Sequence, residues 1–127
     1  MKRLKIKVLT AVVCITLLFV NSGVFAYTYS DQLFGSYGGY GYMLSASRTT
    51  YTATGYFEYA GSCIPVVCIN YSMVNSQTGA RRNYATEVEH HVTMPADDGF
   101  VMVQTLVIGK LRNASGVYVH TTYMLTV

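Results

Sequence analysis

One short stretch of the chain crowds together side chains that could bind a metal ion. Glu87, Glu89 and His91 alternate along the sequence, so in a β-strand they project from one face, and His120 could join them from a later strand. Zinc and copper accept imidazole and carboxylate ligands, but a site needs three or four of them at about 2.0–2.2 Å. One histidine pair without a spaced partner motif is more often a solvated strand face. Glu89, His91 and His120 are therefore metal candidates only, and no cofactor is predicted.

Cys63 and Cys68 are the second group of reactive residues, since their thiols could form a disulfide or take part in redox chemistry. An even number of cysteines in an exported domain is typical of a disulfide. Four residues separate the two, whereas a thioredoxin-like redox motif has two. If the strands on either side pair through this connection, the Cα atoms approach to the roughly 4.4–6.8 Å that a disulfide requires. We therefore predict a Cys63–Cys68 disulfide that stabilises the domain by about 2 kcal/mol.

No spacing in the sequence predicts catalysis. Asp97 and Asp98 are adjacent and precede Gly99, which is typical of a turn. Glycosidase chemistry instead requires two carboxylates that face each other across a sugar. The Gly-x-Ser-x-Gly motif of serine hydrolases is missing from the sequence. We predict that the protein is not an enzyme.

Tyrosine is the residue type that could form a binding surface. Tyr56 and Tyr118 fall on the outward positions of their expected strands. Tyrosine gives a large, rigid contact area with a polar tip, suited to stacking on sugars or to contact with a protein. The alternative is that tyrosine fills a β-core in a chain that has no tryptophan.

The first 26 residues have the pattern of an export signal. A basic start precedes an apolar run over residues 8–20, and small residues then stand at positions 24 and 26. The run is shorter than the about 20 residues that cross a bilayer. We predict cleavage after Ala26, a secreted domain over residues 27–127, and no transmembrane segment in that mature chain.

Removing this leader changes the charge of the protein. The whole chain has 9 basic and 6 acidic residues, a net charge of +3, but residues 27–127 keep five basic residues against six acidic ones, a net charge of −1. A nucleic-acid-binding protein would need a basic patch, which the domain lacks. Its 101 residues suit a single domain.

Alternation of apolar and polar residues predicts strands through this domain. The clearest pattern runs from Tyr51 to Tyr59, where Gly55 marks either a bulge or the close approach of a neighbour. Residues 27–37 form an entry segment without a sustained period. Residues 84–94 favour a strand, although part of them could form a helical turn. Residues 100–111 are apolar at both odd and even positions, so both sides of the expected strand are apolar. This is typical of a strand that is covered on both faces, central in a sandwich, or at an oligomer contact.

Further strands are expected over residues 40–47, 66–74 and 117–125, separated by turn residues. The pattern predicts an all-β fold, an antiparallel β-sandwich or small barrel of about six to eight strands. We expect a small secreted non-catalytic protein that acts through surface contacts with a protein or cell-surface partner. The sequence also allows the protein to form a homo-oligomer. The alternative is a secreted toxin or bacteriocin-like factor acting on other cells' envelopes, although the domain is not cationic and would be weakly attracted to anionic lipid.

Overall fold

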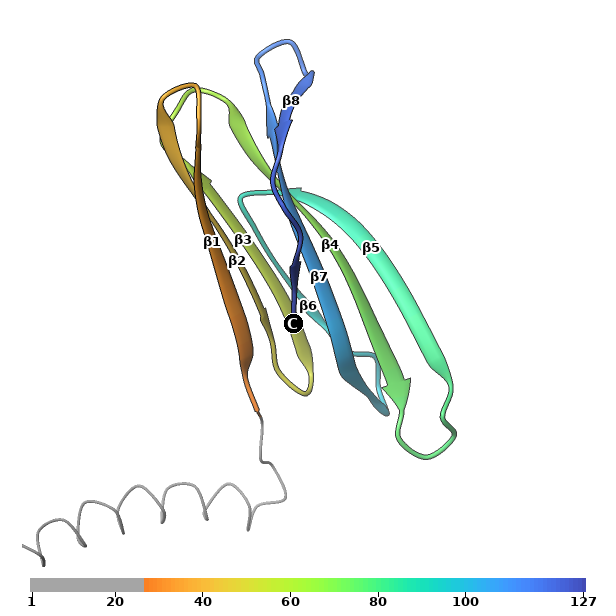
Figure 1. Ribbon diagram of the computed structural model, residues 1–127. Helices are drawn as coiled ribbons and strands as arrows, with labels where there is room; N and C mark the ends of the chain where they lie inside the picture. The colour runs from red at the N-terminus through yellow and green to blue at the C-terminus, as the bar shows by residue number, and fades with distance from the viewer. Residues whose placement is uncertain (1–26) are drawn as a thin grey trace, which may run out of the picture.

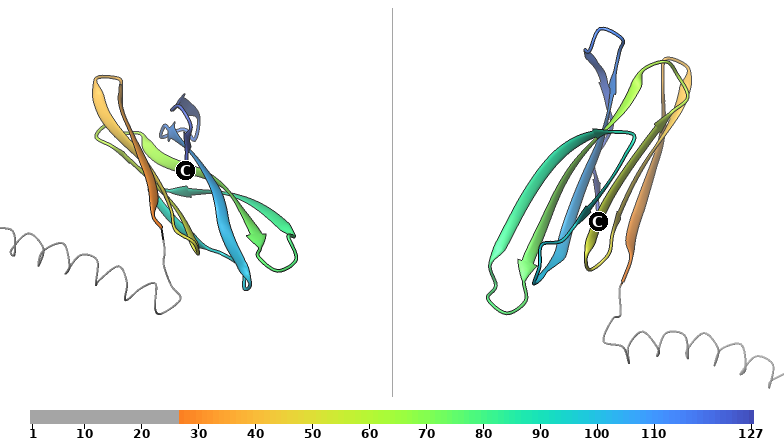
Figure 2. Two further views of the ribbon diagram at one scale, coloured as in Figure 1. Left: turned by 60° about the horizontal axis from the view of Figure 1, so that its bottom comes forward. Right: turned by 180° about the vertical axis from the view of Figure 1, so that it is seen from behind.

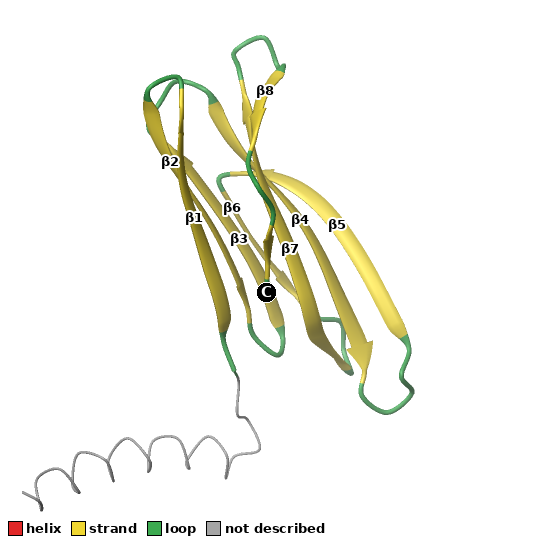
Figure 3. Cartoon of the chain, viewed as in Figure 1, coloured by secondary structure: helices red, strands yellow, loops and turns green. Residues whose placement is uncertain are grey.

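The computed structural model describes residues 27–127, which form nine β-strands and no helix (Figure 3). The expected leader, residues 1–26, lies outside the described residues. The strands, in chain order, are β1 (Tyr29–Tyr37), β2 (Tyr40–Arg48), β3 (Thr52–Tyr59), β4 (Ile64–Asn75), β5 (Arg81–Glu89), β6 (His91–Pro95), β7 (Phe100–Arg112), β8 (Tyr118–Thr121) and β9 (Leu125–Thr126).

These strands make two antiparallel sheets that pack face to face (Figures 1 and 2). Sheet A has the order β1-β2-β3-β6, and sheet B has the order β5-β4-β7-β8, with β9 also paired to β7. The chain passes between the sheets after β3, after β5 and after β6. The predicted all-β antiparallel fold is confirmed, with nine strands in place of the six to eight expected.

The core lies between the two sheets and follows the predicted alternation. Ala53 and Phe57 of β3 face Val67, Ile69 and further residues of β4, and these side chains are buried. Gly55 lies in the same row, where a Cβ atom would be 2.6 Å from Cγ1 of Val67. The close approach suggested for Gly55 is therefore confirmed, because only a residue without a Cβ lets sheet B come so near.

A bulge explains why β7 is apolar at both parities. Ser72 pairs with Gln104 while Met73 pairs with Met102, so Val103 is an extra residue in the ladder. The inward side therefore changes parity, from Met102 before the bulge to Thr105 after it. β7 lies inside sheet B, with β4 along one edge and β8 and β9 along the other, so the prediction of a central strand is confirmed.

The strand expected over residues 84–94 is broken at His90, which corrects the prediction of one continuous element. His90 has φ 66°, a left-handed conformation, and it carries the chain from β5 in sheet B to β6 in sheet A. Its N–H donates to the carbonyl of Pro65 at 3.0 Å, and its carbonyl accepts the N–H of Phe57 at 2.8 Å. One residue thus connects the backbones of both sheets.

The disulfide prediction is wrong, because both cysteines are free. β4 begins at Ile64, so Cys63 and Cys68 lie on one extended segment, and a rise of about 3.3 Å per residue puts them roughly 16 Å apart. An odd separation also directs them to opposite faces: Cys63 packs against the core, and Cys68 lies on the outer face. The prediction assumed that β3 pairs with β4, whereas the two strands belong to different sheets.

Candidate interaction surface on the outer face of sheet A

The outer face of sheet A is made of cross-strand rows of small polar and aromatic side chains. It lies opposite the inward row of Leu33, Leu44 and Phe57. Three rows cross the sheet: Ser30, Ser47, Thr54 and Thr93; Gln32, Ser45, Tyr56 and His91; and Phe34, Met43 and Glu58. We call these eleven residues the sheet A face.

The register that builds these rows is set by the turn between β1 and β2. Gly38 and Gly39 form a two-residue turn with φ of 58° and 84°, the left-handed conformations that a tight hairpin with the right twist requires. The ladders of sheet A then run without a register shift. Because side chains alternate between the two faces, this register decides which residues point outward.

Tyr56 and its neighbours supply the hydrogen-bonding groups at the centre of the face. The hydroxyl of Tyr56 donates to Oε2 of Glu58 at 3.1 Å, and its ring meets His91 edge-on at 6.1 Å. The hydrogen bond to Glu58 is the main cause that raises the pKa of Tyr56, so the phenol keeps its proton at neutral pH. The hydroxyls of Thr54 and Thr93 are 3.0 Å apart, with His91 Nε2 3.4 Å from that of Thr93.

An open hollow lies beside this centre. It has a volume of about 370 Å³ and is lined by Phe34, Met43, Glu58 and neighbouring residues. Phe34 is 69% exposed, which is unusual for a residue with so large an apolar side chain. The hollow therefore combines an apolar wall with one carboxylate.

Charge is distributed unequally between the two outer faces. Glu58 is the single charged residue of the sheet A face. On the outer face of sheet B, Glu87 and Glu89 form ion pairs with Lys110 and Arg112. The sheet A face is consequently almost neutral.

The polar groups on the outer face of sheet B bond to one another. Glu87 accepts hydrogen bonds from the Cys68 thiol at 3.4 Å and the Tyr118 hydroxyl at 3.1 Å, and Lys110 lies 5.1 Å over the Tyr118 ring. Burial, followed by the bond to Glu87, raises the pKa of Cys68 to about 11. The thiol therefore stays protonated at neutral pH and is a poor nucleophile.

The three metal candidates lie in three different places. Glu89 is on sheet B beside Arg112, His91 is on sheet A beside Tyr56, and the ring of His120 lies 3.3 Å from the hydroxyl of Tyr42. Among residues 27–127, no group of three or more histidine, cysteine or acidic side chains is placed to hold a metal ion.

The two tyrosine candidates also lie apart. Tyr56 is on the outer face of sheet A and Tyr118 on that of sheet B, so they do not form one platform. Sequence reasoning missed Gln32, Phe34 and the rest of β1, because their segment has no sustained alternation. The Gly38–Gly39 pair between two tyrosines is the signal that could have found the hairpin.

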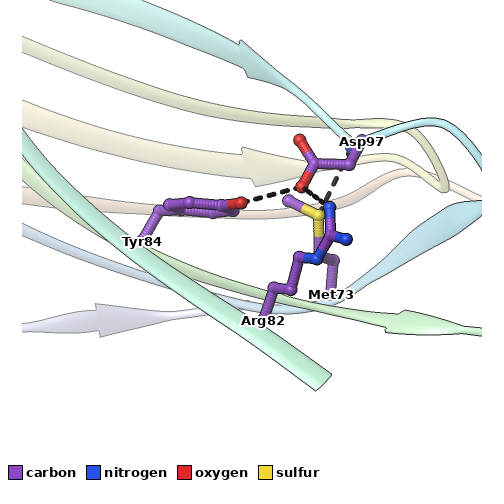
Figure 4. Close-up of polar contacts among 4 residues, drawn as sticks. All are labelled: Met73, Arg82, Tyr84 and Asp97. Atoms are coloured by element: carbon purple, nitrogen blue, oxygen red, sulfur yellow. Dashed lines mark hydrogen bonds and ion pairs between the residues drawn. The ribbon is translucent and has the colours of Figure 1, made fainter. Parts of the chain in front are cut away.

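Asp97 forms a further cluster where β6 is joined to β7 (Figure 4). Its Oδ2 accepts hydrogen bonds from Arg82 at 2.7 Å and from the Tyr84 hydroxyl at 2.8 Å, and its N–H lies 3.3 Å from Sδ of Met73. The bonds from Arg82 and Tyr84 hold the pKa of Asp97 below its ordinary value. This cluster fastens the turn between β6 and β7 to β5, which is a structural role.

Comparison of the chain with protein families, with curated proteins and with solved structures found no match. The part of the chain that the structure describes contains no helix long and apolar enough to cross a membrane.

Proposed function

We propose that the protein is a secreted, non-catalytic interaction module that binds a cell-surface partner through the sheet A face. One observation carries this proposal: the carboxylates on the outer face of sheet B are held in ion pairs, while the sheet A face presents hydroxyl, amide and imidazole groups with a single charge. Tyr56 bonds to Glu58, and Thr93 bonds to Thr54 and His91, but these hydrogen bonds are exposed, so a ligand can reach the groups and exchange bonds with them.

The chemistry of the face fits a neutral polysaccharide. Sugars present hydroxyl groups at their edges and apolar C–H faces, which aromatic rings cover well. Gln32, Tyr56 and His91 supply hydrogen-bonding groups in one row, and Phe34 supplies an exposed ring beside the hollow. An anionic ligand would need cationic side chains, which the sheet A face lacks.

On the outer face of sheet B and at the turn between β6 and β7, the placement of reactive groups supports a role without catalysis. The Cys68 thiol is held in its protonated form, and the carboxylates of Glu87, Glu89 and Asp97 are engaged by cations. A catalytic base would have to be free to accept a proton from a substrate.

A calorimetric titration tests the proposal. The full chain, with its N-terminus identified by intact mass, is titrated with neutral glucans, mannans and galactans. We expect Tyr56→Ala and His91→Ala to weaken binding about tenfold or more, while Tyr118→Ala on the opposite face leaves it unchanged. Because no ion pairs form, the affinity should not change between about 50 mM and 500 mM salt. Binding that is lost in Tyr118→Ala and retained in Tyr56→Ala would refute the proposed site.

The envelope-directed toxin is distinguished by a separate assay. A toxin would inhibit bacterial lawns and release dye from liposomes. The proposed module should do neither at concentrations that saturate its glycan binding.

A further inference from the structure

The two sheets have strand edges that differ in how well they are protected. β6 has five residues and ends in Pro95, while β8 and β9 have four and two. β5 is long, but it carries two arginines and two glutamates and is fastened by Asp97. β1 lies at the edge of sheet A (Figure 2). It has nine residues, no proline and no lysine, and its one charged side chain is Asp31. A long strand edge with so little protection is a template for pairing with another chain.

The backbone groups of β1 alternate between β2 and the open edge. Tyr37 and Tyr40 flank the two-residue turn and form a hydrogen-bonded pair, so the odd-numbered residues of β1 bond to β2. The N–H and C=O groups of Ser30, Gln32, Phe34 and Ser36 therefore point away from the sheet. In agreement, the N–H of Gln32 donates to its neighbour, Oδ1 of Asp31, at 2.8 Å.

We infer that β1 pairs in antiparallel fashion with β1 of a second copy of this chain, about a two-fold axis at Leu33. This register sets Ser30 opposite Ser36 and Gln32 opposite Phe34 of the second copy. All four edge-facing residues of each copy then find a partner, which gives about eight hydrogen bonds. Moving the axis by one residue either way leaves only three such pairs within β1.

Charge also favours this register. With the axis at Leu33, Asp31 lies opposite Gly35 of the second copy, and no like charges face each other. An axis at Asp31 would oppose two carboxylates. The two-fold symmetry is closed, so pairing stops at a dimer and does not continue into a fibre.

Asp31 weakens the association without preventing it. Its carboxylate occupies the N–H of Gln32, which must be released to bond to the second copy. The dimer joins two sheet A faces into one eight-stranded surface, but its existence does not depend on any ligand.

Sedimentation equilibrium of the full chain, between about 1 μM and 1 mM, tests the inference. We expect the mass to rise from monomer to dimer. Gln32→Pro removes one edge-facing N–H from each copy without removing a bond to β2, and should weaken the dimer about tenfold or more. Asn83→Pro makes the same change on the open edge of β5 and should have no effect on the dimer.

Asp31→Ala removes the carboxylate that occupies the N–H of Gln32 and should tighten the dimer several-fold. Asp98→Ala removes the same charge elsewhere and should leave the dimer unchanged.

Hydrogen exchange gives a measurement that does not depend on a variant. The amides of Gln32, Phe34 and Ser36 should gain protection as concentration rises, whereas that of Asn83 should not. A protein that stays monomeric at 1 mM overturns the inference, and the edge would then be open to an extended segment of a different protein. A dimer that Gln32→Pro leaves intact, without added protection in β1, overturns it equally.

Discussion

A methyl group added at Gly109 would test how tightly the two sheets meet. The Cβ of Gly109→Ala would lie 2.8–2.9 Å from three carbon atoms of the Phe57 ring, where carbon atoms normally rest about 3.5–4.0 Å apart. Phe57 is fully buried and packs edge-on against Tyr42 at 5.5 Å, so its ring has little room to move. Overpacking of this kind costs about 1–3 kcal/mol, and the lower entropy of the unfolded alanine chain returns about 0.4–1 kcal/mol. We expect a net loss of about 1–2 kcal/mol.

Urea unfolding followed by circular dichroism measures this loss, and the chain offers a matched control. At Gly41, also in a strand, the nearest atom to a new Cβ is the Gly35 carbonyl oxygen at 3.9 Å, so Gly41→Ala should be neutral or slightly stabilising. Phe57→Leu should partly rescue Gly109→Ala, with a coupling of about 1 kcal/mol or more in the double-mutant cycle. If Gly109→Ala is as stable as Gly41→Ala, or if the cycle is additive, the close packing inferred here is refuted.

Three further outcomes are expected. His90→Gly should stabilise the domain by up to about 1 kcal/mol and His90→Val should destabilise it, since a left-handed φ suits glycine and strains a β-branched residue; thermal unfolding decides. The hydrogen bond from Arg82 lowers the pKa of Asp97 in the folded protein, so the ionised carboxylate stabilises the fold above the unfolded pKa near 3.8. This stabilisation is lost as the pH falls through the pKa of the folded state, so the difference in stability between wild type and Asp97→Asn should shrink below about pH 4. Alkylation without reductant should modify both Cys63 and Cys68, with Cys68 slow until the pH nears 11; a mass two hydrogens lower, unreactive to alkylation, would contradict the free thiols.

Local alternation was sufficient to predict the strands at the centre of the sandwich. In β3 and β4 the apolar residues recur at every second position, and Phe57 and Ile69 point inward as that pattern requires. The break at His90 was not predictable in this way. Val88 and Val92 both take the inward side of their strands, as one continuous strand would also require, but Val88 belongs to sheet B and Val92 to sheet A.

The candidate surface depends on pairings that local patterns do not contain. Gln32, Tyr56 and His91 come from three strands, and their row exists only because β1, β3 and β6 belong to the same sheet. The prediction of a Cys63–Cys68 disulfide was wrong for the same reason. A short separation in sequence brings two residues together only if the chain turns between them, and at Cys63 it extends into β4.

The use of charge connects the two surfaces proposed here. Four of the five basic residues in the described part of the chain lie in sheet B. The fifth, Arg48 in sheet A, donates to the carbonyl of Met102 and covers the ring of Tyr29, so it adds no charge to the sheet A face. The basic residues are therefore concentrated on β5 and on the outer face of sheet B, where their charge disfavours pairing with another chain. The sheet A face and the β1 edge carry almost none of these charges. In a monomer such surfaces favour aggregation, unless the face binds a partner and the edge pairs with another strand. Because the face is tested by glycan titration and the edge by concentration-dependent mass, either proposal can fail while the other stands.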